Sequence, residues 1–453
     1  MVFVFIFFAI LFLPARALAA PRVQDVGEKL VIVIDPGHGG ENQGTIENNH
    51  EEKLMTMTTA LAMYEELLKY EDVEVYLTRT EDVDMSLKER AEFAAEKEAD
   101  FLFSIHYNAS LNHELFGSEV WVSQFPPYNA YGYQFGYEFL SDMRDRGLFI
   151  RGIKTRRGSS GMDYYGIIRE SVALEIPAVI IEHCHVDEDR DAVYCETDEQ
   201  LREFGRADAT AVAKYFGLKS EVLNVDYSNY SLSEASATST VKTTLIDTTE
   251  PDVCQIEFSS ADYENGFLSL SVLAADYDSP LLYYSYSMDG GNTFSPREMW
   301  PDSDALNGTY TDSFTLTLSI QPGTAPDVIV RAYNLYDLYT ESNCYSSPQI
   351  FPSSSAASGE LTGESDDMPS PDETESSIDI VPVGANAVDA NTLDDKPEEE
   401  KEISFFTFLM VCLSFALIML VLVIISQYIA YLNRRKRRLQ RRNEAGRNRN
   451  QLR

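Results

Sequence analysis

Cysteine, basic side chains and internal repetition are all scarce in this chain. Its 453 residues contain only five cysteines, too few for a small scaffold held together by disulfide bonds. The chain has 36 Lys and Arg but 73 Asp and Glu, which gives a formal net charge of −37. This charge argues against binding to nucleic acid, whose phosphates would be repelled. No segment recurs at a fixed period, which argues against a repeat architecture. What remains is an acidic chain long enough for two or three domains, and it suits a role outside the cytoplasm.

The five cysteines fall in three parts of the chain. Cys184 and Cys195 lie in the first half, Cys254 and Cys344 near the two ends of a later segment, and Cys412 in an apolar run near the C-terminus. Either of the first two pairs could form a disulfide, and the sequence does not choose between free and paired thiols.

The N-terminal segment has the composition of a secretion signal. Residues 1–13 are nearly all apolar, and the triplet Ala17-Leu18-Ala19 that follows is the small-x-small pattern of a signal-peptidase site. We therefore expect residues 1–19 to be a signal peptide that is cleaved after Ala19. No Lys or Arg precedes the apolar run, so a misplaced start or an uncleaved anchor stays an alternative.

The C-terminal part reads as a membrane anchor on a stalk. Residues 351–402 are rich in Ser, Pro, Asp and Glu, which predicts a disordered, self-repelling stalk. Residues 403–425 carry no charge and are long enough for one transmembrane helix. Residues 426–453 are strongly basic, which predicts a cytoplasmic tail that interacts with lipid headgroups rather than with nucleic acid. We expect a single-pass protein of the cell membrane whose folded part lies outside the cytoplasm.

Between these ends the composition predicts two folded domains. Over residues 29–218, runs of Val, Ile and Phe alternate with helical patterns, which indicates an α/β domain with a mostly parallel twisted sheet flanked by helices. Residues 219–250 are rich in Ser and Thr and read as a linker. Residues 251–350 hold short alternating runs typical of an immunoglobulin-like or fibronectin-like β-sandwich. There Asp276 and Asp278 could help to bind calcium, although such residues more often solvate a loop.

Three short apolar runs of the first domain end on residues that can bind or serve a metal. They are VIVIDPGHGG at residues 31–40, FLFSIHYN at 101–108 and AVIIEHC at 178–184. Buried parallel strands present their functional groups at their carboxyl ends, so His38, His106 and Glu182 are expected to meet in one crevice. Zinc accepts imidazole nitrogen and carboxylate oxygen, and a catalytic zinc keeps one position open for water. The pattern predicts a metal site.

A third metal ligand is expected from the segment after the His38 loop. Glu52 begins an amphipathic pattern, which would place its carboxylate on the first turn of a helix near the crevice. Neighbouring residues are rivals for this role, since the pattern does not exclude a small error in register: Glu47, His50 and Glu51.

Together these residues bring a protein family into view. The sequence contains the blocks DPGHGG at 35–40, EEK at 51–53, LTR at 77–79, SLKER at 86–90, SIHYN at 104–108 and PAVIIE at 177–182. They closely resemble, in the same order, the zinc-dependent N-acetylmuramoyl-L-alanine amidases of bacterial cell walls. The resemblance extends over nearly the whole first domain, which makes it far more specific than a single motif.

The resemblance implies both a site and a reaction. His38, Glu52 and His106 would be zinc ligands, and Glu182 would be the catalytic carboxylate. The substrate would be the amide between N-acetylmuramic acid and the L-alanine of the peptide stem, so peptidoglycan is the expected partner. An activator protein is possible and unidentified. Two other functions stay open: a zinc amidohydrolase or peptidase acting on another bond, and a non-catalytic wall-binding scaffold.

Two further histidines follow the predicted catalytic carboxylate. The family commonly continues with small or apolar residues, whereas here the sequence is His183-Cys184-His185. If the chain stays extended, alternation along the strand points His183 and His185 away from the face that carries Glu182. We therefore expect neither histidine to join the metal site.

Overall fold

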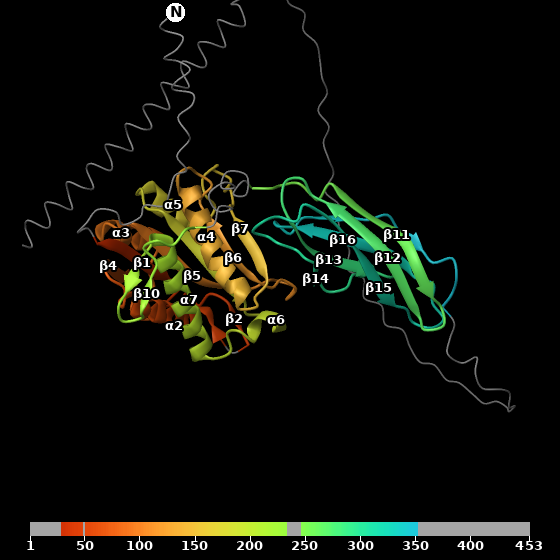
Figure 1. The fold of residues 1–453 in the computed structure, drawn as a ribbon, viewed down its shortest axis with the longest axis horizontal. Coiled ribbons are helices and arrows are strands. Elements are labelled where there is room, and N and C mark those ends of the chain that lie inside the picture. Colours follow the sequence, from red (N-terminus) through yellow and green to blue (C-terminus); the bar gives the residue numbers. More distant parts are fainter. Residues whose placement is uncertain (1–28, 49, 233–245, 352–453) are drawn as a thin grey trace, which may run out of the picture. The chain divides into compact units, whose positions relative to one another are not determined.

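A computed structural model describes residues 29–48, 50–232 and 246–351, all within one compact unit (Figure 1). Its first part is built on a six-stranded sheet in the order β4-β1-β5-β8-β6-β7. In that order the strands are β4 (Val73–Leu77), β1 (Leu30–Pro36), β5 (Phe101–Asn108), β8 (Ala178–His185), β6 (Ser118–Val122) and β7 (Ile150–Lys154). Neighbouring strands are parallel except for β6 and β8, which are antiparallel.

Helices cover both faces of this sheet, which explains why its central strands are apolar along their length. One face packs against α2 (Glu52–Leu67), α4 (Tyr128–Asp145) and α7 (Asp198–Phe216). The other face packs against α3 (Leu87–Glu96) and α5 (Gly166–Ala173). The remaining short elements are α6 (Asp189–Ala192), the pair β2 (Ile46–Glu47) and β3 (His50–Glu51), and the pair β9 (Lys219–Ser220) and β10 (Val225–Asp226).

The second part consists of two antiparallel sheets that share one apolar core. One sheet contains β11 (Val253–Asp262), β12 (Phe267–Ala275) and β15 (Thr311–Ser319). The other contains β13 (Leu281–Ser287), β14 (Glu298–Met299), β16 (Asp327–Asn334), β17 (Tyr339–Glu341) and β18 (Tyr345–Ser346). Alternate residues of β12 and β16 face inward, which is the arrangement of a β-sandwich.

The α/β class expected for the first domain agrees with the observed sheet and helices. After α7 the chain stays packed against this domain as far as Leu232, and the Tyr230 hydroxyl donates to Glu138 Oε2 at 2.8 Å. The expected signal peptide at residues 1–19, the stalk at 351–402 apart from Phe351, and the basic tail at 426–453 lie outside the described residues, and the domain boundaries stay predictions.

The prediction of a transmembrane helix is corrected. Within the described ranges, no helix is both long enough and apolar enough to cross a bilayer. The longest of them, α7, has 19 residues, but charged side chains such as Arg206 and Lys214 recur along it and are costly in hydrocarbon. Residues 403–425 are outside the described part. We therefore withdraw the C-terminal transmembrane helix from the fold class, and with it the single-pass membrane localisation and the membrane as a partner.

The four cysteines within the described ranges are free thiols. Cys184, Cys195 and Cys254 are buried, and Cys344 is exposed. Asp276 accepts hydrogen bonds from Ser279 N and from the Asn334 side chain, so its contacts are those of a loop-ordering residue.

The packing of α7 on α2 yields a stability prediction. A Cβ added at Gly205 would lie 2.2 Å from the Thr59 carbonyl oxygen and 2.8 Å from Met63 N, both backbone atoms of α2. We expect Gly205→Ala to push the helices apart and lower the free energy of unfolding by about 1–3 kcal/mol. Chemical denaturation measures this. The exposed control Glu203→Ala should change it by less than about 0.5 kcal/mol, and an unchanged Gly205→Ala would contradict this account of the interface.

Candidate metal centre and active site

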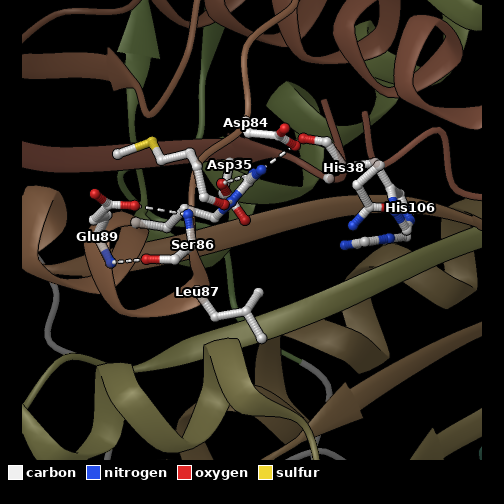
Figure 2. A pocket seen from close by; sticks show the side chains of 11 residues that line it. Asp35, His38, Asp84, Ser86, Leu87, Glu89 and His106 are labelled. Carbon is white, nitrogen blue, oxygen red and sulfur yellow. Dashed lines mark hydrogen bonds and ion pairs between the residues drawn. The ribbon is translucent and has the colours of Figure 1, made fainter. Parts of the chain in front are cut away.

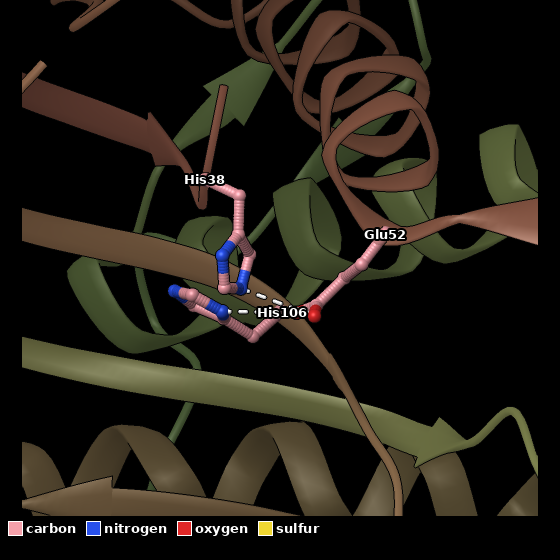
Figure 3. A group of neighbouring side chains, drawn as sticks. All are labelled: His38, Glu52 and His106. Atoms are coloured by element: carbon pink, nitrogen blue, oxygen red, sulfur yellow. Dashed lines mark hydrogen bonds and ion pairs between the residues drawn. The ribbon is translucent and has the colours of Figure 1, made fainter. Parts of the chain in front are cut away.

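Three side chains from three different elements meet at one end of the sheet (Figure 3). His38 lies in the loop after β1, Glu52 is the first residue of α2, and His106 lies on β5. The Glu52 carboxylate lies between the two rings, with Oε2 3.1 Å from His38 Nε2 and Oε1 3.1 Å from His106 Nδ1. One ligand atom from each residue lies within 4.8 Å of the others. The group is therefore able to hold a metal ion.

The backbone comes so close to these side chains that glycine is required at two positions. A Cβ at Gly37 would lie 2.3 Å from the His106 ring, and a Cβ at Gly44 would lie 2.4 Å from Glu52 Oε2. Gly44 also has a φ of +69°, a conformation that favours glycine. His38 itself has a φ of 60°, which is uncommon outside glycine and turns its ring towards the other two ligands.

Hydrogen bonds to neighbouring groups orient the ligands. His38 Nδ1 lies 2.9 Å from Asn42 Oδ1, and because that oxygen only accepts, Nδ1 donates in this contact and Nε2, which faces Glu52, is the nitrogen that would bind a metal. The backbone N–H groups of Thr45 and Tyr107 donate to the two Glu52 oxygens at 2.9 and 3.1 Å. Burial raises the pKa of Glu52, but hydrogen bonds with His106 and His38 outweigh it and hold that pKa well below its usual range. Glu52 is thus held as an anion, the form in which a carboxylate binds a metal.

A buried ion pair braces the loop that carries His38. Arg90 Nη1 lies 2.7 Å from Asp35 Oδ1, and Arg90 also donates to the carbonyl oxygens of Pro36 and His38. Arg79 donates to the Gly37 carbonyl oxygen at 2.8 Å. Both arginines therefore support the scaffold.

A pocket of about 560 Å³ opens beside the metal group (Figure 2). His38 and His106 lie at one side of it, and the start of α3 forms another side through Ser86, Leu87 and Glu89. Ser86 and Glu89 cap α3 reciprocally, because Ser86 N donates to Glu89 Oε2 and Glu89 N donates to Ser86 Oγ. A substrate next to the metal group could occupy this space.

Glu182 lies next to the metal group in the middle of the sheet. Its register partners are His106 on β5 and Glu119 on β6, so the three side chains leave the same face of three adjacent strands. Glu182 Oε2 is buried and has no hydrogen-bond partner among the described residues. Burial, together with the negative charges of Glu52 and Glu119, raises the pKa of Glu182 well above its usual range. Glu182 therefore binds a proton more firmly than an exposed glutamate does.

The other candidates for the third metal ligand lie outside the metal group. Glu47, His50 and Glu51 belong to the β2–β3 hairpin and are not part of the metal group.

The two histidines after Glu182 are also outside the metal group. His183 is buried against α7, with Nε2 3.0 Å from Asp208. A bulge follows, because Asn108 pairs with His185 where regular pairing would bring it to Cys184. The alternation expected from the sequence therefore holds for His183 but breaks down beyond it.

Glu119 is a residue that the sequence reasoning missed. It is 2% exposed and lies beside two buried cations of β7, Arg151 and Lys154. The available signal was weak: charged residues inside the short strands SEVWV and IRGIK, where a buried sheet would have apolar ones.

Comparison with known proteins identifies the type of domain. Residues 32–214 match the family model described as N-acetylmuramoyl-L-alanine amidase. The chain is 33% identical over 190 residues to N-acetylmuramoyl-L-alanine amidase CwlM of Bacillus licheniformis, covering 41% of this chain and 69% of that one. It is 32% identical over 191 residues to the sporulation-specific N-acetylmuramoyl-L-alanine amidase of Bacillus subtilis, covering 42% and 69%. The solved catalytic domain of CwlV from Bacillus (Paenibacillus) polymyxa var. colistinus aligns over 42% of this chain and 99% of its own, with 26% identity and a TM-score of 0.37.

The bracing ion pair yields a second stability prediction. Replacing Arg90 by Met leaves the buried Asp35 carboxylate without its cation, and we expect a loss of about 3–5 kcal/mol in the free energy of unfolding. Urea denaturation tests this against Arg202→Met, which removes a surface pair with Glu65 at 3.6 Å and should cost less than about 1 kcal/mol. Equal losses for the two variants would show that the buried pair does not brace the loop.

Proposed function

The chain belongs to the N-acetylmuramoyl-L-alanine amidase family, and we propose that it performs this reaction with a zinc ion held by His38, Glu52 and His106 and with Glu182 as general base. The activity is hydrolysis of the amide that joins N-acetylmuramic acid to L-alanine in peptidoglycan. The observation that carries the proposal is the gathering of two imidazoles and one carboxylate within 4.8 Å beside a pocket.

The donor set supports zinc as the metal. Zinc binds imidazole nitrogen and carboxylate oxygen, and three protein ligands leave a fourth position for water or substrate. Asn42 fixes the tautomer of His38, and two backbone N–H groups fix Glu52, so the ligands are oriented before a metal arrives. A bound zinc ion would polarise the scissile carbonyl and acidify a water molecule.

Glu182 supplies the proton transfers. It takes a proton from the attacking water as the new C–O bond forms, and it returns that proton to the nitrogen as the C–N bond breaks. The products are the carboxyl group of the muramic acid and the free amine of L-alanine. Its raised pKa suits this role, because a base must bind the proton firmly enough to remove it from water.

The metal assignment predicts a loss of zinc in ligand variants. His38→Ala and His106→Ala each leave two ligands, so we expect purified variants to carry little zinc and to release no stem peptide from peptidoglycan. Elemental analysis and mass spectrometry of the digest measure the two effects. The control His113→Ala changes an exposed histidine that pairs with Asp187 outside the metal group, and it should retain both zinc and activity. Full activity of the chelated parent protein would refute the assignment.

The role of Glu182 predicts that, unlike in the histidine variants, activity is lost while zinc is retained. Glu182→Gln keeps the shape of the side chain but cannot accept a proton, so we expect turnover to fall by about 10²–10⁴-fold while zinc stays bound. Release of peptides with a free L-alanine amine measures turnover. Glu170→Gln, a change at a carboxylate that pairs with Arg169, is the matched control and should behave as the parent does. A Glu182→Gln variant with near-parent turnover would eliminate Glu182 as the base.

A further inference from the structure

Two carboxylates lie side by side on adjacent strands, and they differ in how many hydrogen bonds they accept. Glu119 and Glu182 are register partners of β6 and β8, and such antiparallel partners have Cβ atoms about 4.5–5.5 Å apart. Glu182 Oε2 has no partner among the described residues, whereas both oxygens of Glu119 are saturated. The four donors to Glu119 are Asn108 Nδ2 at 2.8 Å and Trp121 Nε1 at 3.1 Å on Oε1, and Arg151 Nε and Lys154 Nζ, both at 2.8 Å, on Oε2.

The Arg151 guanidinium also bonds to the β-sandwich. Its Nη1 donates to Tyr283 OH and its Nη2 to Asp337 Oδ2, each at 2.8 Å. Tyr283 OH in turn donates to the carbonyl oxygen of Phe116, just before β6, at 2.7 Å. Arg151 is 2% exposed, so its charge is offset by these partners rather than by water.

The sandwich packs closely around this contact. A Cβ at Gly152 would lie 2.6 Å from Leu335 Cδ1, so the sandwich reaches the backbone of β7. Phe116 and Leu335 belong to one small apolar cluster that joins the two parts. Asp337 is further held by Arg297, whose Nη1 lies 2.8 Å from its second oxygen. The position of Asp337 is therefore well defined.

We propose that the β-sandwich is a positioning module of the active site, in which Asp337 and Tyr283 hold Arg151 and Arg151 holds Glu119 beside Glu182. This inference rests on the proposed role of Glu182 as the base. In this arrangement Glu119 and Arg151 are positioning residues, since Arg151 acts through Glu119 and Glu119 acts through Glu182.

The proposal has a physical reason, which is that two neighbouring carboxylates compete for one proton. Two neighbouring carboxylates that lack counter-ions tend to share one proton, as in acid dyads. Arg151 and Lys154 neutralise Glu119 and occupy its oxygens, so Glu119 does not bond to Glu182, and Glu182 stays available to water. If Asp337 or Tyr283 released Arg151, Glu119 would lose part of this support. The effect would fall on kcat and leave KM unchanged, because substrate contacts are untouched.

The test measures kcat and KM of the full chain on a soluble N-acetylmuramoyl-peptide. We expect Arg151→Met to lower kcat by about 10–100-fold at unchanged KM and zinc content. Arg151→Lys, which keeps a cation beside Glu119, should recover part of the loss. Asp337→Asn should lower kcat in the same direction and less strongly. The matched control is Glu341→Gln, which weakens another carboxylate–arginine pair of the sandwich, with Arg331 at 2.9 Å, and should leave kcat unchanged.

Thermal unfolding of every variant separates positioning from a loss of fold, and Asp337→Asn serves if Arg151→Met does not fold. Parent-like kcat in Asp337→Asn and in the folded Arg151 variants, alongside an inactive Glu182→Gln, would overturn this inference alone. A loss of kcat in Glu341→Gln as large as that in Asp337→Asn would also overturn this inference alone. An active Glu182→Gln would overturn the proposed base and this inference with it.

Discussion

The alignment of β5, β8 and β6 is the constraint on which the rest of the site depends. It places His106, Glu182 and Glu119 in one row on one face of the sheet. A slip of one residue in β8 would turn Glu182 towards α7 and away from the metal group. The register is fixed by burial, because Ile180 and Ile181 pack into apolar cores on opposite faces. Ordinary core packing thus sets the geometry of the candidate site.

Local pattern predicted a large part of this arrangement, for identifiable reasons. His38 and His106 follow or end apolar strands, and Glu52 begins an amphipathic helix, so strand ends and a helix start indicated where they would meet. The antiparallel placement of β6 beside β8 depends on pairing between distant segments, which no local pattern specifies. For the same reason the partnership of Glu119 with Arg151 was not foreseen.

The electrostatics of the site rest on a difference between similar groups. Glu52 and Glu119 are buried and Glu182 is partly exposed, yet of the three only Glu182 has a buried oxygen, Oε2, without a hydrogen-bond partner within the described residues. Donors hold the pKa values of Glu52 and Glu119 below the usual range, and burial raises that of Glu182. Such a division assigns distinct roles to like side chains. In an acidic chain, the placement of a few cations therefore matters more than the net charge.

The main chain approaches His106 at Gly37 and Glu52 at Gly44 so closely that it limits which substitutions this sequence can accept. Backbone groups make many of the contacts that hold the site: two N–H groups donate to Glu52, and the carbonyl oxygens of Gly37 and His38 accept from Arg79 and Arg90. Substitutions near the site are therefore constrained by the path of the chain, and Arg79 and Arg90, which bond to that path, share the constraint. The two glycines are constrained most directly, since any larger residue would occupy space that the His106 ring or the Glu52 carboxylate already fills.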